Sequence, residues 1–226
     1  MTEQDTSRLY ADAAHRYDRL TNLMSFGTGA RYRIRAVASM QLPVGGVAVD
    51  LGSGTGGIAL AMQDVVGETG KVVAIDSSPD MLAEARRLGV RETVEGPMSS
   101  IPLPDNSVDG VACGYSIRYA SDLDLTLREI KRVLKPRAPL VVLEMTIPPS
   151  RIGRFTASLL VRRFSPTLMT ICCGSRGVGN LMRHFWDSVE AFPPPHEVLD
   201  RMQQAGLERP RMRGPWSMLV EYRANG

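Results

Sequence analysis

The stretch 47–57, VAVDLGSGTGG, constrains the fold of this chain more than any other part of its sequence. The apolar run 47–49 is typical of a strand that is buried on both faces of a parallel sheet. Glycines follow, and because glycine has no Cβ, they allow a sharp turn and bring backbone N–H groups close to a ligand. A helical pattern then covers 58–66. This order indicates an α/β fold that holds a small molecule at the turn.

Two acidic residues narrow the kind of small molecule. Asp50 directly precedes the first glycine, and Asp76 ends the next apolar strand, 71–76, about twenty residues further along. A carboxylate at the tip of that strand suits the hydroxyls of a ribose. An acid beside the glycine turn does not suit a pyrophosphate, because it adds negative charge where the helix N-terminus attracts anions. The two acids therefore favour S-adenosylmethionine (SAM), which has a ribose and a cationic sulfonium but no phosphate. A tight turn without a ligand is the alternative.

The rest of the chain alternates strand-like and helical segments, which predicts a parallel sheet with helices on both faces. Strand-like runs cover 47–51, 71–76, 92–96, 108–114, 138–146, 209–213 and 217–223. Helical periodicity covers 58–66, 79–88, 123–134 and 196–205. In an open α/β sheet, ligands bind where the carboxyl ends of the strands meet, and Gly52, Asp76 and Gly114 all fall at this edge.

Composition excludes several other classes of protein. With 226 residues, of which 43% are hydrophobic, we expect one domain over 1–226 with a substantial core. The net charge of +3 and the scattered arginines do not indicate a nucleic-acid partner. The three cysteines lack the spacing of metal ligands, and no apolar run approaches the roughly 20 residues of a membrane span. We therefore expect a cytoplasmic protein, without a metal, that acts on a small molecule.

Four passages resemble the ubiquinone/menaquinone C-methyltransferase (UbiE-type) family. They are HRYDRLTNLMSFG at 15–27, GETGKVVAIDSSPDML at 67–82, IPLPDNSVDGV at 101–111 and LREIKRVLKPRAPLVVLEM at 127–145. The resemblance implies a Rossmann-like class I methyltransferase fold, with a seven-stranded, mostly parallel sheet. It also implies an enzyme that transfers the methyl group of SAM to a hydroxylated ring or enol carbon, such as that of a prenylated quinol precursor. Methylation of an oxygen or nitrogen in a natural product or lipid headgroup stays open, as does a non-catalytic SAM-binding protein.

The resemblance also implies a set of residues that bind SAM. They are Tyr17, Asp50, Gly52, Ser53, Gly54, Asp76, Ser77, Met81, Met98 and Gly114. In this set Asp50 would orient the amino group, Asp76 would accept from both ribose hydroxyls, and the N–H of Met98 would serve the adenine. Pro97 departs from the family, which has an Asp or Asn there, and proline offers neither a side-chain acceptor nor a backbone donor. Tyr17 would belong to an N-terminal lid over 1–35, unless it only packs a helix onto the sheet.

The acceptor end of the site is expected in CGYSIRYASD, at 113–122. Arg118 would hold a phenolate or enolate oxygen, because its guanidinium is always charged and presents a fork of donors. A ring carbon becomes a good nucleophile only after the neighbouring hydroxyl has lost its proton. Tyr119 or His184 would move that proton. The alternatives are an ion pair between Arg118 and an acid such as Asp122, and a histidine that is merely packed.

The segment 148–195 interrupts the alternation at the ligand-bearing edge, so we expect it to select the acceptor. Its apolar residues are interspersed with arginines, among them Arg151, Arg154, Arg162 and Arg163. This composition predicts either a mobile apolar lid or a surface helix that lies on anionic lipid, as peripheral membrane contact. Helices that cover the sheet, or that form the contact of a homodimer, are the alternative.

Overall fold

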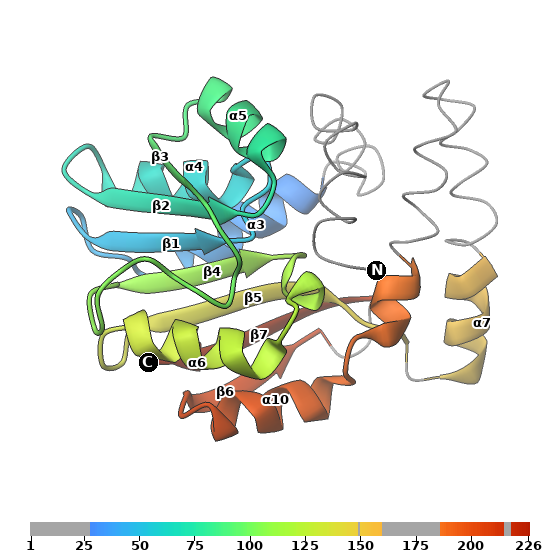
Figure 1. Ribbon diagram of the computed structural model, residues 1–226. Helices are drawn as coiled ribbons and strands as arrows, with labels where there is room; N and C mark the ends of the chain where they lie inside the picture. The colour runs from blue at the N-terminus through green and yellow to red at the C-terminus, as the bar shows by residue number, and fades with distance from the viewer. Residues whose placement is uncertain (1–27, 149, 160–185, 215–217) are drawn as a thin grey trace.

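The structure is a computed structural model that describes residues 28–148, 150–159, 186–214 and 218–226. These residues form a seven-stranded sheet in the order β3-β2-β1-β4-β5-β7-β6 (Figure 1). The strands are β1 Val47–Leu51, β2 Lys71–Asp76, β3 Glu92–Glu95, β4 Gly110–Gly114, β5 Pro139–Met145, β6 Glu208–Arg213 and β7 Leu219–Asn225. The first five run parallel, whereas β7 pairs antiparallel with both β5 and β6. The predicted mostly parallel sheet is therefore confirmed.

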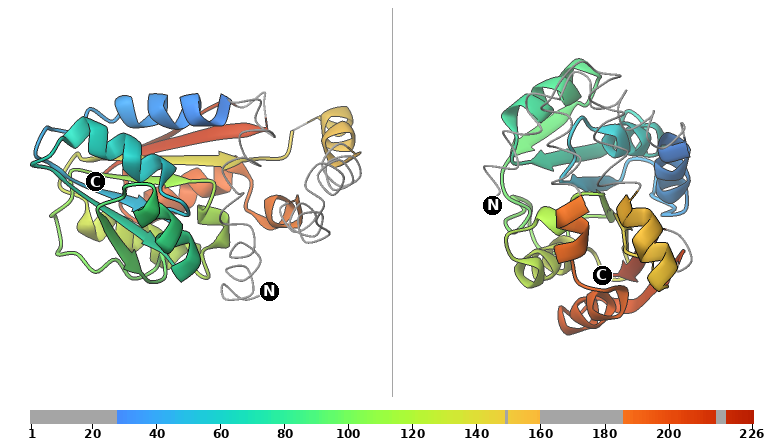
Figure 2. Two further views of the ribbon diagram at one scale, coloured as in Figure 1. Left: turned by 90° about the horizontal axis from the view of Figure 1, so that it is seen from above. Right: turned by 90° about the vertical axis from the view of Figure 1, so that its right-hand side faces the viewer.

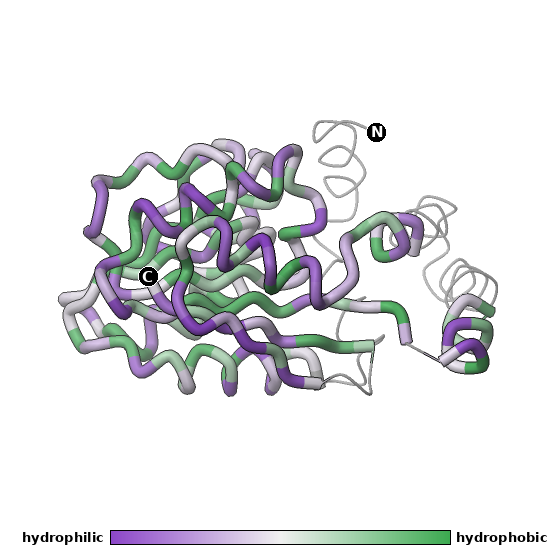
Figure 3. The backbone as a smooth tube through the Cα atoms, turned by 90° about the horizontal axis from the view of Figure 1, so that it is seen from below, coloured by the Kyte–Doolittle hydropathy of each residue, from purple (hydrophilic) through white to green (hydrophobic). Residues whose placement is uncertain are grey.

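Helices cover both faces of this sheet, as the sequence predicts. They are α3 Thr28–Ala38, α4 Gly57–Val66, α5 Pro79–Arg87, the 3-10 helix η1 Ile117–Tyr119, α6 Leu123–Val133, α7 Arg151–Leu159 and α10 Pro195–Gln204. Helices α3 and α4 pack on one face, and α6 and α10 pack on the other (Figure 2). Because both faces are covered, most residues of the central strands are apolar, and green stretches run through the middle of the fold in Figure 3.

Helix α3 and the short η1 are elements that the sequence did not predict, and α3 is the longer of the two. Its apolar residues are few, but Ala36 and Val37 are buried in the core that α4 and β5 also line. The expected lid over 1–35 therefore divides: residues 28–35 belong to this helix on the sheet, and 1–27 lie outside the described residues. Elsewhere the predicted boundaries agree to within two residues. Strand β4 begins at Gly110 and not at Val108, which makes only an isolated bridge to Leu134.

The carboxyl ends of β1, β2, β4 and β5 lie at one edge of the sheet, and α7 and the helical turns at 186–191 lie beyond it (Figures 1 and 2). Trp186 is fully buried against Ala157 of α7 and against Met218, which precedes β7. The described ends of the segment 148–195 therefore stand at the ligand-bearing edge. Within the described part of the chain, no helix combines the length and the apolar character needed to cross a membrane.

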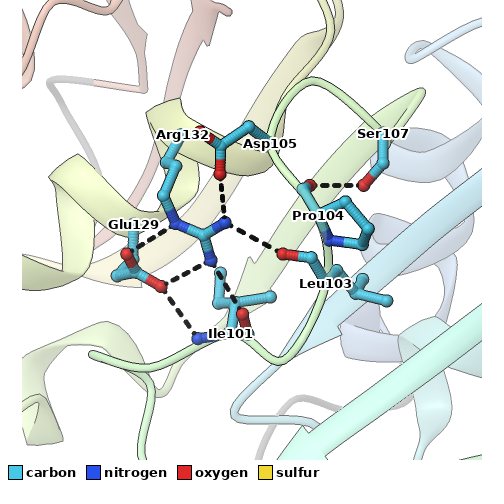
Figure 4. Close-up of polar contacts among 7 residues, drawn as sticks. All are labelled: Ile101, Leu103, Pro104, Asp105, Ser107, Glu129 and Arg132. Carbon is cyan, nitrogen blue, oxygen red and sulfur yellow. Dashed lines mark hydrogen bonds and ion pairs between the residues drawn. The ribbon is translucent and has the colours of Figure 1, made fainter.

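A branched polar network fixes the loop between β3 and β4 to helix α6 (Figure 4). Arg132 of α6 donates to the carbonyls of Ile101 and Leu103, at 2.8 and 2.9 Å, and to Asp105 at 2.7 Å. Glu129, one turn earlier, accepts from Arg132 and from the N–H of Ile101 at 3.0 Å. Residues 101–107 belong to no helix or strand, so their backbone groups lack the hydrogen bonds of a regular element. The guanidinium of Arg132 and the carboxylate of Glu129 supply hydrogen bonds to several of these groups.

Replacing Arg132 by Met should lower the free energy of unfolding by about 1 to 3 kcal/mol, because buried carbonyls and Glu129 lose their donor. Urea unfolding followed by circular dichroism measures the change. The matched control is Arg128→Met, an exposed position on the same helix, where we expect a change within about 0.5 kcal/mol. An equal loss at both positions would contradict the role of the network.

The same comparison has a predictable pH dependence. Hydrogen bonds from Arg132 hold the pKa of Glu129 below its usual value. A carboxyl with a lowered folded pKa stabilises the protein above its unfolded pKa, and this contribution is lost as the pH falls through the folded pKa. The difference in the free energy of unfolding between the wild type and Arg132→Met should therefore become smaller as the pH is lowered through the folded pKa of Glu129.

Candidate functional site

The glycine turn after β1 is held between β2 and the segment that follows β4. Its backbone is left-handed at Gly52 and Gly54, where φ is 67° and 54°. The N–H of Gly52 donates to the carbonyl of Ile75 in β2 at 2.8 Å. A Cβ on Gly52 would lie 2.4 Å from Oγ of Ser116, whereas a Cβ on Gly54 would meet no heavy atom of the described residues within 4 Å. The turn is therefore packed on one side and open at Gly54.

The carboxylate of Asp76 ties this turn to the next one. Its two oxygens accept from the N–H of Gly54 at 2.7 Å and from the N–H of Ser78 at 2.9 Å. Burial raises the pKa of Asp76, and these backbone hydrogen bonds oppose the rise. Ser78 then caps α5 by accepting from the N–H of Met81, whose side chain is buried. The predicted residues Asp76, Ser77 and Met81 thus follow one another around the tip of β2.

Asp50 is only 1% exposed and lies directly beneath the glycine turn. It accepts from the N–H of Ala59, in the first turn of α4, at 2.8 Å. The pKa of Asp50 is raised to about 7, mainly because burial disfavours the carboxylate; the hydrogen bond from Ala59 opposes the rise, the charge of Asp76 adds to it, and Arg33 lowers it. The structure thus gives Asp50 a partner in the protein that the sequence did not predict.

Arg33 of α3 is a residue that the sequence reasoning missed. Its Cζ and Nε lie 3.4 Å from the position of a Cβ on Gly57, so that the guanidinium covers the start of α4. Arg33 precedes the buried residues Ala36 and Val37 by three and four positions, which places all three on one side of the helix. Recognition of α3 from the sequence would have revealed this cation beside the turn.

Ser53 carries an unpaired polar group inside the turn. Its Oγ is buried and has no hydrogen-bond partner among the described residues. A buried hydroxyl without a partner is unfavourable in the protein alone, and a ligand with polar atoms satisfies it.

The ends of β1 and β4 meet on the other side of the turn. Ser116 donates to the carbonyl of Leu51 at 3.1 Å, and Met98 Sδ lies 3.2 Å from the position of a Cβ on Gly52. A Cβ on Gly114 would lie 2.5 Å from Cδ1 of Ile58 in α4. Met98 therefore lies against the glycine turn and Gly114 lies against α4, at the edge of the sheet where the two acids are found. That these residues share one ligand stays a prediction.

Arg118 lies in a second polar cluster, four residues beyond the end of β4. It forms an ion pair with Glu144 of β5, and their side chains are 1% and 0% exposed. Its Nε donates to Oγ of Ser188 at 3.1 Å, and its Nη2 donates to the hydroxyl of Tyr119 at 3.2 Å. The guanidinium also lies 4.6 Å from the centre of the Tyr119 ring. Arg118 and Tyr119 therefore lie together, with an acid that the sequence did not identify.

The partner of Arg118 is Glu144 and not Asp122, which instead caps α6 by accepting from the N–H of Leu125 at 2.8 Å. Oε1 of Glu144 also accepts from the N–H of Met145 at 2.7 Å. Its Oε2 is buried and has no hydrogen-bond partner among the described residues. Burial raises the pKa of this carboxyl, and the charge of Arg118 opposes the rise. The signal in the sequence was a single acid inside the apolar strand LVVLEM.

Two predicted residues, Tyr17 and His184, lie outside the described residues, as does most of the segment 148–195. The others form two groups at one edge of the sheet. The glycine turn and Asp76 make the first, and Arg118 and Tyr119 belong to the second. Ser116 connects the two groups, because it packs against Gly52 and lies two residues before Arg118.

The sequence is similar to those of known methyltransferases. The model of the ubiE/COQ5 methyltransferase family matches residues 1–213. A demethylmenaquinone methyltransferase from Thermus thermophilus is 35% identical, over 88% of this chain and 91% of that protein. A ubiquinone/menaquinone biosynthesis C-methyltransferase UbiE from Syntrophotalea carbinolica is 34% identical, over 93% of this chain and 89% of that protein.

Among solved structures, a SAM-dependent methyltransferase from Thermotoga maritima, described as a possible histamine N-methyltransferase, has a TM-score of 0.69. It is 21% identical, and the match covers 97% of this chain and 99% of that one, which supports the fold alone. The chain belongs to the ubiE/COQ5 methyltransferase family, and it is a SAM-dependent methyltransferase with the Rossmann-like fold of such enzymes.

Proposed function

We propose that this protein transfers the methyl group of SAM to a ring carbon of a hydroxylated, quinol-like acceptor. The observation that carries this proposal is the match to the ubiE/COQ5 family over residues 1–213. Relatives named for demethylmenaquinone and for ubiquinone/menaquinone biosynthesis, more than 30% identical over nearly the whole chain, support the class of acceptor.

The glycine turn suits the donor. SAM, when bound, supplies an electrophilic methyl group on a cationic sulfonium. The open backbone at Gly54 admits a ligand, and the buried Oγ of Ser53 offers it a hydrogen bond. Asp76, already fixed by two backbone donors, would accept from the ribose hydroxyls. Ser77, Met81 and the N–H of Met98 would border the adenine, and Tyr17 would cover the bound cofactor.

Opposite charges at the two ends of the turn suit the amino-acid part of SAM. Asp50 would attract the ammonium group from beneath the turn, and Arg33 would bind the carboxylate at the start of α4. The N-terminus of α4 adds to the attraction for an anion at the same point. Such a pair favours a zwitterion over a phosphate, which lacks the ammonium group.

Arg118 would stabilise the oxyanion of the acceptor, and Tyr119 or His184 would take part in the proton transfer. Carbon methylation depends on this charge, because it delocalises from the oxygen onto the neighbouring ring carbon. The buried position of the guanidinium supports the role, since electrostatic stabilisation is stronger where water is excluded.

Helix α7 would rest on an anionic membrane surface, from which a lipid-like acceptor is taken. Ile152 and Phe155 are 79% and 69% exposed, and with Leu159 they follow helical spacing on one face. Ala157 is buried against Trp186, which attaches the helix to the protein. The helix carries Arg151 and Arg154 and no acid, so its charge suits anionic headgroups. Figure 3 shows the resulting alternation of purple and green along α7.

The acceptor is tested with labelled SAM and a panel of hydroquinones, simple phenols and amine lipids. We expect the label on a ring carbon next to a hydroxyl of the hydroquinones, identified by NMR as a C–CH3 group. If the label were found only on oxygen or nitrogen, the result would contradict carbon methylation and support O- or N-methylation instead. Tight SAM binding without transfer to any of the three classes would contradict an enzyme of this specificity.

Arg33→Met should weaken SAM binding about tenfold or more, because a charge-assisted hydrogen bond is lost. Isothermal titration calorimetry measures the dissociation constant. Arg35→Met, at an exposed position on the same helix, is the matched control and should bind SAM like the wild type. Decarboxylated SAM should bind to the wild type and to Arg33→Met equally; a tenfold difference with this ligand too would exclude recognition of the carboxylate.

The double substitution Ile152→Ser with Phe155→Ser should weaken binding to vesicles of phosphatidylcholine and phosphatidylglycerol by about tenfold or more. Vesicle sedimentation measures the bound fraction. Val44→Ser removes an equally exposed apolar residue from the turn before β1 and serves as the control. Absence of vesicle binding by the wild type would contradict the membrane contact. If the wild type self-associates and the double substitution abolishes this self-association, the exposed face of α7 would instead be the contact of a homodimer.

A further inference from the structure

Glu144 is a buried acid at the acceptor end of the site, and the roles of Arg118, Tyr119 and His184 do not account for it. It ends the apolar part of β5, where its neighbours along the strand are Leu143 and Met145. An uncompensated carboxylate at this depth is costly, and the ion pair with Arg118 together with the N–H of Met145 uses only Oε1. A purely structural pair would be expected to satisfy both oxygens.

The second oxygen of this carboxylate is the observation that points to a ligand. Oε2 is completely buried and has no hydrogen-bond partner among the described residues. It belongs to the same side chain that holds Arg118, the group assigned to the oxyanion. A hydroxyl that approaches the guanidinium is therefore brought to an acceptor oxygen at the same time.

We propose that Glu144 is the general base of the methyl transfer, with Oε2 as the atom that receives the hydroxyl proton of the acceptor. This inference rests on the proposed function, because it requires an acceptor with an acidic hydroxyl next to the methylated carbon. In this scheme Glu144 takes the role of base that Tyr119 or His184 would otherwise fill. Ser188 donates to Tyr119, and both hydroxyls accept from Arg118, so these two side chains are positioning residues that fix the guanidinium.

The proton transfer balances within the cluster. The O–H bond of the acceptor breaks, an O–H bond forms at Oε2, and the negative charge passes from Glu144 to the acceptor oxygen. Until the methyl group is transferred, Arg118 remains beside a single negative charge, first on Glu144 and then on the oxyanion, and this charge is neutralised when the ring carbon accepts the methyl group from the sulfonium. After the ring carbon has gained the methyl group, it loses its own hydrogen to water and the proton on Oε2 returns to the ring oxygen. One proton is thus released in each turnover, and Glu144 is again a carboxylate.

The chemical surroundings of Glu144 suit a base that works near neutral pH. The groups that face it are Arg118 from η1, Cys113 and Tyr115 at the end of β4, and Tyr222 from β7. Burial favours the neutral acid, whereas Arg118 favours the carboxylate, so that the two effects oppose one another. A base must be ionised in order to act, so activity should fall as the pH is lowered.

The test compares Glu144→Gln with Glu221→Gln. Glu221 is the matched control, because it is also a buried acid paired with an arginine, Arg223. It lies on β7 in register with Leu143, so its side chain is on the opposite face of the sheet from Glu144. With a hydroquinone acceptor, Glu144→Gln should lower kcat about 100-fold or more and should lose the acid limb of the pH profile. The dissociation constant of SAM should not change, and Glu221→Gln should retain kcat.

A second acceptor separates a base from a structural residue. A phenol with electron-withdrawing substituents is already ionised at neutral pH, so Glu144→Gln should methylate it at close to the wild-type rate. Equal losses with both acceptors would overturn the role as a base. Should Glu144→Gln fail to fold, Glu144→Asp retains a carboxylate and should keep the acid limb; a flat profile in that variant would also overturn the inference. Absence of transfer by the wild type itself would instead contradict the proposed function.

Discussion

Burial of the parallel strands on both faces is the constraint on which the rest of this structure depends. Helices cover the two faces, so a polar side chain on these strands can reach a partner only where the strands end. Three acids occupy this edge: Asp50 on β1, Asp76 on β2 and Glu144 on β5. Each is removed from water, and each is compensated by backbone N–H groups or by an arginine.

The fold could be predicted from the sequence because the hydrophobic periodicity and the positions of turn residues indicate the same elements along most of the chain. Short apolar runs, glycine turns and helical spacing gave the seven strands and helices α4, α5, α6 and α10. Helix α3 was missed because it buries little more than Ala36 and Val37, and arginines interrupt its pattern. Tertiary contact with α4, which no local pattern reveals, decides its structure.

The site divides in the same way. The half proposed for the donor lies on two adjacent strand ends, and residues close in sequence, Asp50 to Gly54, identify it. The half proposed for the acceptor joins positions that are 26 and 70 residues apart, Arg118 with Glu144 and with Ser188. No spacing rule connects such positions, so the charge of Arg118 could be recognised from the sequence but its partners could not. The alternative to the oxyanion role, an ion pair between Arg118 and an acid, was right in kind, but Asp122 was the wrong acid because it caps α6.

The short segment 115–119 has a consequence for how such an enzyme diversifies. Ser116 packs against Gly52, and Arg118 holds Glu144, so one tight piece of backbone touches both halves of the site. A change of acceptor that altered this segment would also disturb the turn assigned to the donor. New acceptor preferences are therefore more readily acquired on α7, which stands outside the sheet, than at 186–191, where Ser188 contacts Arg118. A substitution on the outer face of α7 would change the surface that meets the acceptor and would leave the packing of the segment 115–119 intact.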